Sequence, residues 1–116
     1  MATTALTLDN FVDTVKENGI VLVDFWAAWC GPCQRFGPIF EDASGRYEGV
    51  VFGKVDTEAE QDLSYQLQIE AIPTLMAFKD GQLVFRQAGL LNGHQLDDLI
   101  GQVEQLDLSQ AAQAND

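Results

Sequence analysis

Segments typical of β-strands alternate with segments typical of α-helices along this chain, and this alternation limits its possible folds more than any other feature. The first strand-like segment, residues 20–27, is almost continuously apolar, as expected for a strand buried on both faces of a sheet. Asp80-Gly81, between the last two strand-like segments, is a strong signal for a tight hairpin. The expected strands are residues 20–27, 50–56, 74–78 and 83–86, and the expected helices lie near residues 11–18, 32–47, 58–67 and 93–106. This order predicts an α/β domain with a mixed sheet.

The two cysteines, Cys30 and Cys33, can pair only with each other within the chain. A bridge between them closes a loop too short to constrain the unfolded chain much, so a structural disulfide explains them poorly. A structural zinc site needs four ligands, and the single histidine, His94, lies about sixty residues away, so we expect no metal. The remaining interpretation is a dithiol that opens and closes.

The cysteine pair lies where a buried strand gives way to a helix. Cys30 is expected just before the first helical turn, where unpaired N–H groups and the helix dipole stabilise a thiolate and lower the thiol pKa. Gly31 is expected to permit the tight turn, and Pro32 suits a first-turn position that needs no donor. Cys33, one turn further on, is expected to be the more buried thiol and to attack a mixed disulfide formed at Cys30.

The charge balance excludes several classes of partner. Six Lys and Arg against eighteen Asp and Glu give a net charge of −12, which is incompatible with general nucleic-acid binding and with docking on anionic lipid. The longest apolar runs, near residues 20–23 and 75–78, are too short to span a bilayer. No secretory signal is visible, so we expect a cytoplasmic protein whose partners are neutral or basic protein surfaces.

The chain also resembles a known family. The segment Trp29-Cys30-Gly31-Pro32-Cys33, preceded by Val23-Asp24-Phe25-Trp26-Ala27 and followed in order by Ile72-Pro73-Thr74, Phe78-Lys79-Asp80-Gly81 and Gly89, is similar to that of thioredoxins, over about residues 6–106. The resemblance implies a thioredoxin fold, with a central mixed sheet flanked by helices. It also implies a protein-disulfide reductase that binds no cofactor and whose disulfide is reduced again by a flavin-dependent, NADPH-dependent thioredoxin reductase.

The resemblance also implies roles for individual residues. Cys30 resembles the attacking thiolate and Cys33 the resolving thiol. Asp24 resembles the buried carboxylate that takes or relays the Cys33 proton, and Lys54 the lysine beside it. Pro73 resembles the cis-proline that faces the dithiol. The residues expected to contact disulfide-containing protein substrates are Trp29, Gly31, Pro32, Ile72, Pro73, Gly89 and Leu90.

The residues themselves leave several alternatives open. Asp24 could face solvent at a strand edge, Pro73 could be an ordinary trans proline, and Lys54 could be only a surface charge. The chain could instead be a disulfide oxidant or isomerase, an electron donor dedicated to one enzyme, or a binding module with incidental cysteines. We expect one domain over residues 1–107, a short polar tail over residues 108–116, and a monomer.

Overall fold

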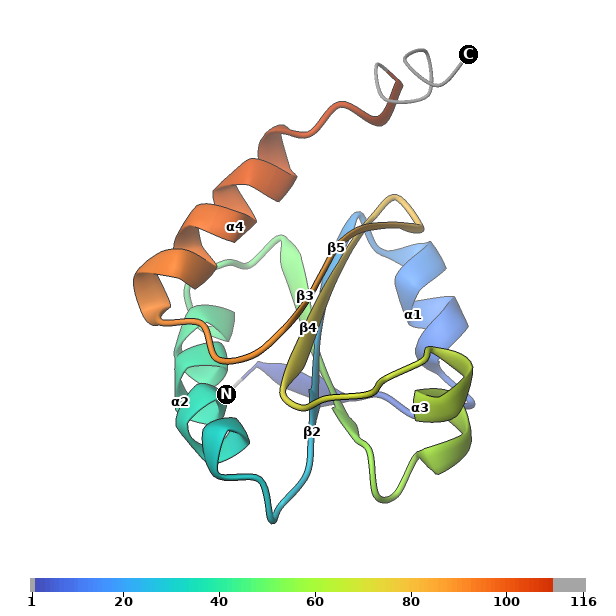
Figure 1. Ribbon diagram of the computed structural model, residues 1–116. Coiled ribbons are helices and arrows are strands. Elements are labelled where there is room, and N and C mark those ends of the chain that lie inside the picture. Colours follow the sequence, from blue (N-terminus) through green and yellow to red (C-terminus); the bar gives the residue numbers. More distant parts are fainter. Residues whose placement is uncertain (1, 110–116) are drawn as a thin grey trace.

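A five-stranded mixed sheet forms the centre of the computed structural model, which describes residues 2–109 (Figure 1). The strand order is β1-β3-β2-β4-β5, in which β1, β3 and β2 are parallel and β4 and β5 are antiparallel to their neighbours. The strands are β1 (Thr3–Ala5), β2 (Ile20–Trp26), β3 (Val50–Asp56), β4 (Thr74–Lys79) and β5 (Gln82–Ala88). The helices are α1 (Phe11–Glu17), α2 (Gly31–Ser44), α3 (Gln61–Gln66) and α4 (Gly93–Gln105).

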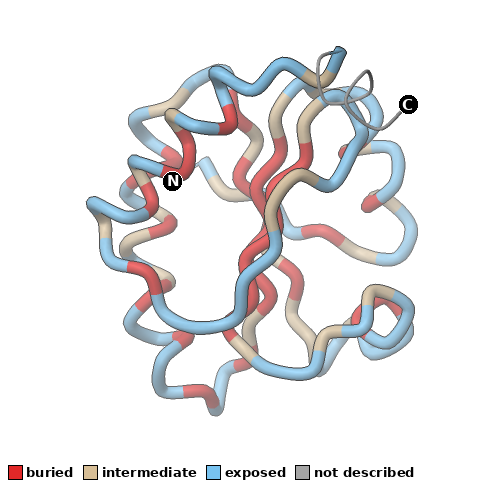
Figure 2. The backbone as a smooth tube through the Cα atoms, turned by 45° about the horizontal axis from the view of Figure 1, so that its top comes forward, coloured by how far each residue is buried: buried red, intermediate tan, exposed pale blue. Residues whose placement is uncertain are grey.

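Helices cover both faces of this sheet, with α2 and α4 on one side and α1 and α3 on the other (Figure 1). Side chains of β2 alternate between the two resulting cores because successive residues of a strand point to opposite faces. Leu22 packs with residues of α2 and α4, whereas Val21 and Val23 pack with residues of α1 and α3. Buried residues follow the central strands, and the edge strand β5 is largely exposed (Figure 2).

The predicted α/β class and the mixed sheet are confirmed, and the segments differ from expectation mainly at their ends. The short strand β1 was not predicted, because three residues of sequence Thr-Thr-Ala carry no periodic signal. Helix α3 begins at Gln61 rather than near residue 58. The Asp56 carboxylate accepts hydrogen bonds from the backbone N–H groups of Glu58 and Ala59, at 3.0 and 3.4 Å, and holds these residues in a turn. Residues 110–116 of the expected tail lie outside the described residues.

Cationic side chains fasten two helix ends to the sheet. Lys79 Nζ, at the end of β4, donates to the carbonyl oxygens of Val103, Glu104 and Leu106 at 2.7–2.9 Å. Arg86, on β5, donates to the carbonyl oxygens that follow α3. Both cations therefore satisfy carbonyl groups that a helix terminus leaves unpaired, and they complement the negative end of the helix dipole.

Gly53 on β3 makes room for Leu6, and we predict that Gly53→Ala destabilises the fold. A Cβ at position 53 would lie 2.3 Å from Leu6 Cδ1, in a region where Leu6 is fully buried. Relieving that overlap should lower the free energy of unfolding by about 1–3 kcal/mol. The matched control is Gly101→Ala on α4, where a Cβ would meet no atom within 4 Å. This substitution should raise the free energy of unfolding by about 0.5–1 kcal/mol. Urea unfolding of both variants measures the two effects, and equal effects at the two positions would contradict the packing argument.

Candidate functional site

The two cysteines form a disulfide at the beginning of α2. Cys30 is the N-cap residue in an extended conformation, and its Sγ accepts a hydrogen bond from the backbone N–H of Cys33 at 3.2 Å. The Cα atoms of the pair are 5.2 Å apart, and both residues pack against Ala27. The expectation that Cys33 is more buried than Cys30 is wrong, because each of the two residues is 4% exposed. Cys30 is buried as well, because it packs in one cluster with Ala27 and Ile72.

Gly31 and Pro32 occupy the first positions of α2, between the cysteines. The tight turn expected of Gly31 is not what this residue provides. Its φ lies outside the left-handed region, because the helix has already begun there, and a Cβ would meet no atom within 4 Å. The glycine instead leaves open space beside the disulfide. Pro32 lies in the first turn, where its missing N–H leaves no intrahelical bond unmade.

A loop from a distant part of the sequence meets the disulfide from the other side. The Ile72–Pro73 peptide bond is cis, as the resemblance implied, and the Ile72 carbonyl oxygen lies 3.7 Å from Cys30 Sγ. Gly89, with φ +110°, donates its backbone N–H to the Pro73 carbonyl oxygen at 2.8 Å. Such a positive φ favours glycine, because a Cβ would strain it. The exposed Leu90 follows directly. Residues 72–73 and 89–90 therefore lie together next to the disulfide.

Asp24 lies at the centre of the sheet, so the alternative of a solvent-facing edge position is excluded. Its neighbours in register are Lys54 on β3 and Leu75 on β4, and its side chain is 0% exposed. Neither carboxylate oxygen has a hydrogen-bond partner. Burial raises the pKa of Asp24 from 3.8 to about 7, and the positive charge of Lys54 opposes this increase. Asp24 points to the same face as Leu22, which is the face that α2 covers.

Lys54 and the two tryptophans lie around Asp24 and the disulfide. Lys54 Nζ lies 5.1 Å from the centre of the Trp26 ring, an arrangement that allows a cation–π interaction. Trp26 is partly buried and packs against the cysteine cluster. Trp29 is 69% exposed, which is unusual for such a large apolar side chain and leaves its ring open to a partner.

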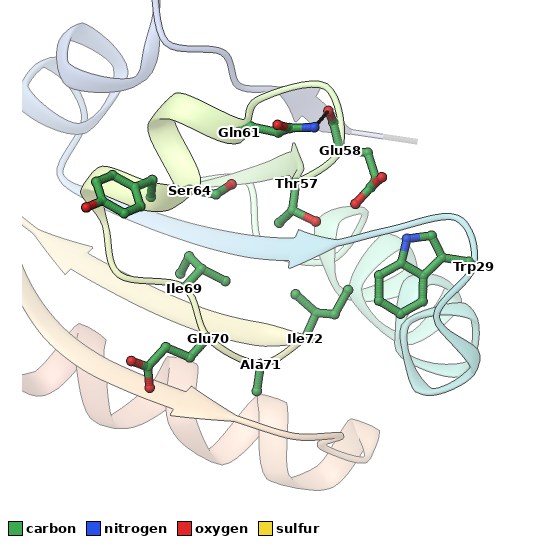
Figure 3. Close-up of a pocket in the computed structure, with 10 residues that line it drawn as sticks. Trp29, Thr57, Glu58, Gln61, Ser64, Ile69, Glu70, Ala71 and Ile72 are labelled. Atoms are coloured by element: carbon green, nitrogen blue, oxygen red, sulfur yellow. Dashed lines mark hydrogen bonds between the residues drawn. The ribbon is translucent and has the colours of Figure 1, made fainter.

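A pocket of about 330 Å³ opens between Trp29 and Ile72 on one side and α3 on the other (Figure 3). Its remaining lining residues were not among those predicted from the sequence. Only one sequence signal could have pointed to them: Tyr65, an aromatic residue in a short helix, outside the apolar positions of that helix. The residues missed are Thr57, Glu58, Gln61, Ser64, Tyr65, Ile69, Glu70 and Ala71.

Comparisons with known proteins agree with this geometry. The family model for thioredoxin matches residues 2–104. A Streptomyces coelicolor protein named "Putative thioredoxin 2" is 47% identical over 97% of this chain and 84% of its own length. A thioredoxin of Staphylococcus saprophyticus is 37% identical over 86% of this chain and 96% of its own. The solved structure of a mutant thioredoxin from Halobacterium salinarum has a TM-score of 0.83 at 31% identity, covering 90% of this chain and 93% of that one.

The fold, the disulfide and these similarities define a thiol–disulfide oxidoreductase. The chain belongs to the thioredoxin family. Within residues 2–109, no cluster of three or more His, Cys, Asp or Glu side chains could hold a metal ion. Nor does this part of the chain contain a helix long and apolar enough to cross a membrane.

The buried Asp24 predicts an unusual pH dependence of stability. Because its pKa is about 7 in the folded protein and near 3.8 in the unfolded chain, the folded state binds more protons between these values. The contribution of Asp24 to stability is therefore favourable at low pH and is lost as the pH rises from about 4 to 7, by up to about 4 kcal/mol. Asp24→Asn removes this titration.

The measurement is the free energy of unfolding of the oxidised protein and of Asp24→Asn at pH 4, 6 and 8. Between pH 4 and pH 8 the free energy of unfolding of Asp24→Asn should rise by several kcal/mol relative to that of the unmodified protein. Because the other carboxylates titrate in both proteins, this relative change reports on Asp24 alone. A difference that stays constant with pH would show that Asp24 titrates normally.

Proposed function

We propose that this chain is a general protein-disulfide reductase in which Cys30 attacks the substrate and Cys33 releases it. The observation that carries the proposal is the position of Cys30 at the helix N-terminus, with the Cys33 N–H directed at its sulfur and the Ile72 carbonyl opposite. A thiolate at this position gains a hydrogen bond and the favourable end of the helix dipole. Cys30 is therefore the better nucleophile of the two once the disulfide is reduced.

The first step exchanges one disulfide for another. The Cys30 thiolate attacks one sulfur of the substrate disulfide, a new S–S bond forms, and the other substrate sulfur leaves as a thiolate that takes a proton. The extended substrate lies against Ile72, Pro73, Gly89 and Leu90. The Ile72 backbone, Trp29, and the open space over Gly31 and Pro32 complete this contact surface.

The second step releases the reduced substrate. Cys33 loses its proton, its thiolate attacks Cys30 Sγ, and the second substrate sulfur leaves as a thiolate that is then protonated. The substrate gains two electrons and two protons in total, and Cys30 and Cys33 are left as a disulfide. Asp24 takes the Cys33 proton, because a carboxylate with a pKa of about 7 is a competent base near neutral pH. Lys54 keeps this pKa from rising further.

The oxidised protein then needs a reductant. We assign this role to a flavin-dependent thioredoxin reductase that draws on NADPH, so the chain itself carries its electrons only on the cysteine pair. The protein acts as a monomer in the cytoplasm, with the activity contained in residues 1–107.

A reducing role is favoured over an oxidising or isomerising one by the residues between the cysteines. A histidine there would stabilise the Cys30 thiolate and make the disulfide more oxidising, and this chain has Gly31 and Pro32 instead. A pure binding role is disfavoured, because it gives no reason for two cysteines to meet at a helix N-terminus beside a cis-proline.

The reduction potential of the Cys30–Cys33 pair tests the direction of electron flow. We expect a value near about −270 mV, as is typical of thioredoxin. It is measured by equilibrating the protein in dithiol redox buffers and following Trp29 fluorescence, which the adjacent disulfide should quench. A value near about −120 mV would make the protein an oxidant and contradict the proposal. A pair that never forms a disulfide would bring the binding module forward.

Single cysteine variants test the order of the two steps. Cys33→Ser should react with a protein disulfide once and remain joined to the substrate through Cys30, because nothing releases it. Non-reducing gels and mass spectrometry detect that complex, and NADPH consumption with thioredoxin reductase should fall to background. Cys30→Ser is the matched control and should form no such complex. Trapping through Cys33 in the Cys30→Ser variant, at a rate similar to that of Cys30, would reverse the assigned roles.

A further inference from the structure

The pocket between Trp29 and α3 carries a charge that the two-step reaction does not use. Its lining includes two acidic residues, Glu58 and Glu70, and no Lys or Arg. In Figure 3 the Glu58 carboxylate points toward the opening beside Trp29, whereas the Glu70 carboxylate points away from the other lining residues. The Glu58 carboxylate forms no ion pair within residues 2–109. The opening beside the disulfide therefore presents one uncompensated negative charge.

The inner wall of the same pocket holds an unsatisfied hydroxyl. Ser64, on α3, is only 7% exposed, and its Oγ has no hydrogen-bond partner. Figure 3 shows this hydroxyl pointing from α3 toward the side where Thr57 lies. A buried polar atom without a partner is costly, so native proteins rarely keep one unless something else satisfies it. Because this Oγ is also closed to solvent, Ser64 marks the inner limit of the pocket, and a ligand meets the groups nearer to Trp29 and Glu58.

The geometry points to an arginine of the substrate polypeptide as the occupant of this pocket, close in sequence to the substrate cysteine. This inference rests on the proposed function, since it concerns the same substrate. A guanidinium group can stack on the exposed Trp29 ring and pair with Glu58, because it is planar and has five N–H donors. The volume of about 330 Å³ suits one long side chain and lies at the lower limit for a small-molecule site.

The pocket is also in the right place to recognise such a residue. Trp29 directly precedes Cys30, and the Ile72 carbonyl lies 3.7 Å from Cys30 Sγ, so two lining residues also flank the reactive sulfur. An extended chain advances about 3.3 Å per residue. An arginine within about three residues of the attacked cysteine therefore reaches the pocket while the cysteine sits at Cys30. Lysine is a poorer occupant, because its compact ammonium neither stacks as a plane nor reaches several acceptors at once.

The test compares disulfide substrates that differ at one position. Each substrate is the symmetric disulfide of two copies of an otherwise neutral octapeptide with one cysteine, so its two sulfurs are equivalent. Arg, Lys, Gln or Glu is placed at each position within three residues of the cysteine. The second-order rate constant for reduction by the prereduced protein is divided by that for dithiothreitol, which removes the effect of each substitution on the peptide thiol itself.

We expect Arg at one position to raise this ratio about 5- to 10-fold over Gln, with Lys giving at most about twofold and Glu giving less than Gln. Glu58→Gln should reduce the preference for Arg to about twofold or less, whereas Glu70→Gln, with the same change in net charge, should keep it.

The outcomes are distinct. Equal ratios for Arg and Gln at all six positions would overturn the inference, while reduction of the Gln peptide would leave the proposed function intact. An equal loss of preference in Glu58→Gln and Glu70→Gln would mean general charge attraction in place of a pocket, and equal ratios for Arg and Lys would refute guanidinium recognition. If no peptide is reduced at all, the proposed function itself fails.

Discussion

The pairing of β2 with neighbours on both sides is the constraint on which the whole site depends. β3 runs parallel to β2, and β4 runs antiparallel to it. The C-terminal ends of β2 and β3 and the N-terminal end of β4 therefore lie along the same edge of the sheet, across the strands. That edge therefore collects Cys30 after β2, Thr57 and Glu58 after β3, and Pro73 before β4. β5, antiparallel to β4, ends there too and brings Gly89 against Pro73. Four segments far apart in the sequence thus meet around one disulfide.

The central position of β2 also sets the chemistry of Asp24. A carboxylate in the middle of a sheet covered on both faces loses its hydration, and none of its oxygen atoms has a partner within the described residues. The same burial that makes the ionised carboxylate unfavourable raises its pKa to about 7, where it can exchange a proton near neutral pH. Stability and proton transfer therefore oppose each other at this one residue, and Lys54 moderates the conflict without removing it.

Local patterns in the sequence predicted most of the elements that build this arrangement. The long strands were predicted from their apolar runs, and the amphipathic helices α2 and α4 from their apolar period, although the expected end of α2 lies three residues beyond Ser44. The hairpin at Asp80-Gly81 was predicted because this residue pair favours positive φ. In the structure both residues adopt it, at 51° and 84°. Prediction failed where a single side chain decides the backbone, as Asp56 does before α3, and where a strand is too short to show a pattern, as in β1. The turn predicted at Gly31 is also absent, because α2 already begins at this residue.

By itself the sequence determined the α/β class, the placement of a dithiol at the start of a helix, and the net charge of −12 that excludes nucleic acid as a general partner. These depend on short-range order along the chain: side-chain periodicity, helix N-cap chemistry and net charge. Only the tertiary structure decided that Asp24 is buried beside Lys54, that the Ile72 carbonyl faces Cys30, and that Glu58 and Ser64 share a pocket with Trp29. Burial, shifted pKa values and pockets are properties of neighbours in space, and strand order, which no local pattern encodes, chooses those neighbours.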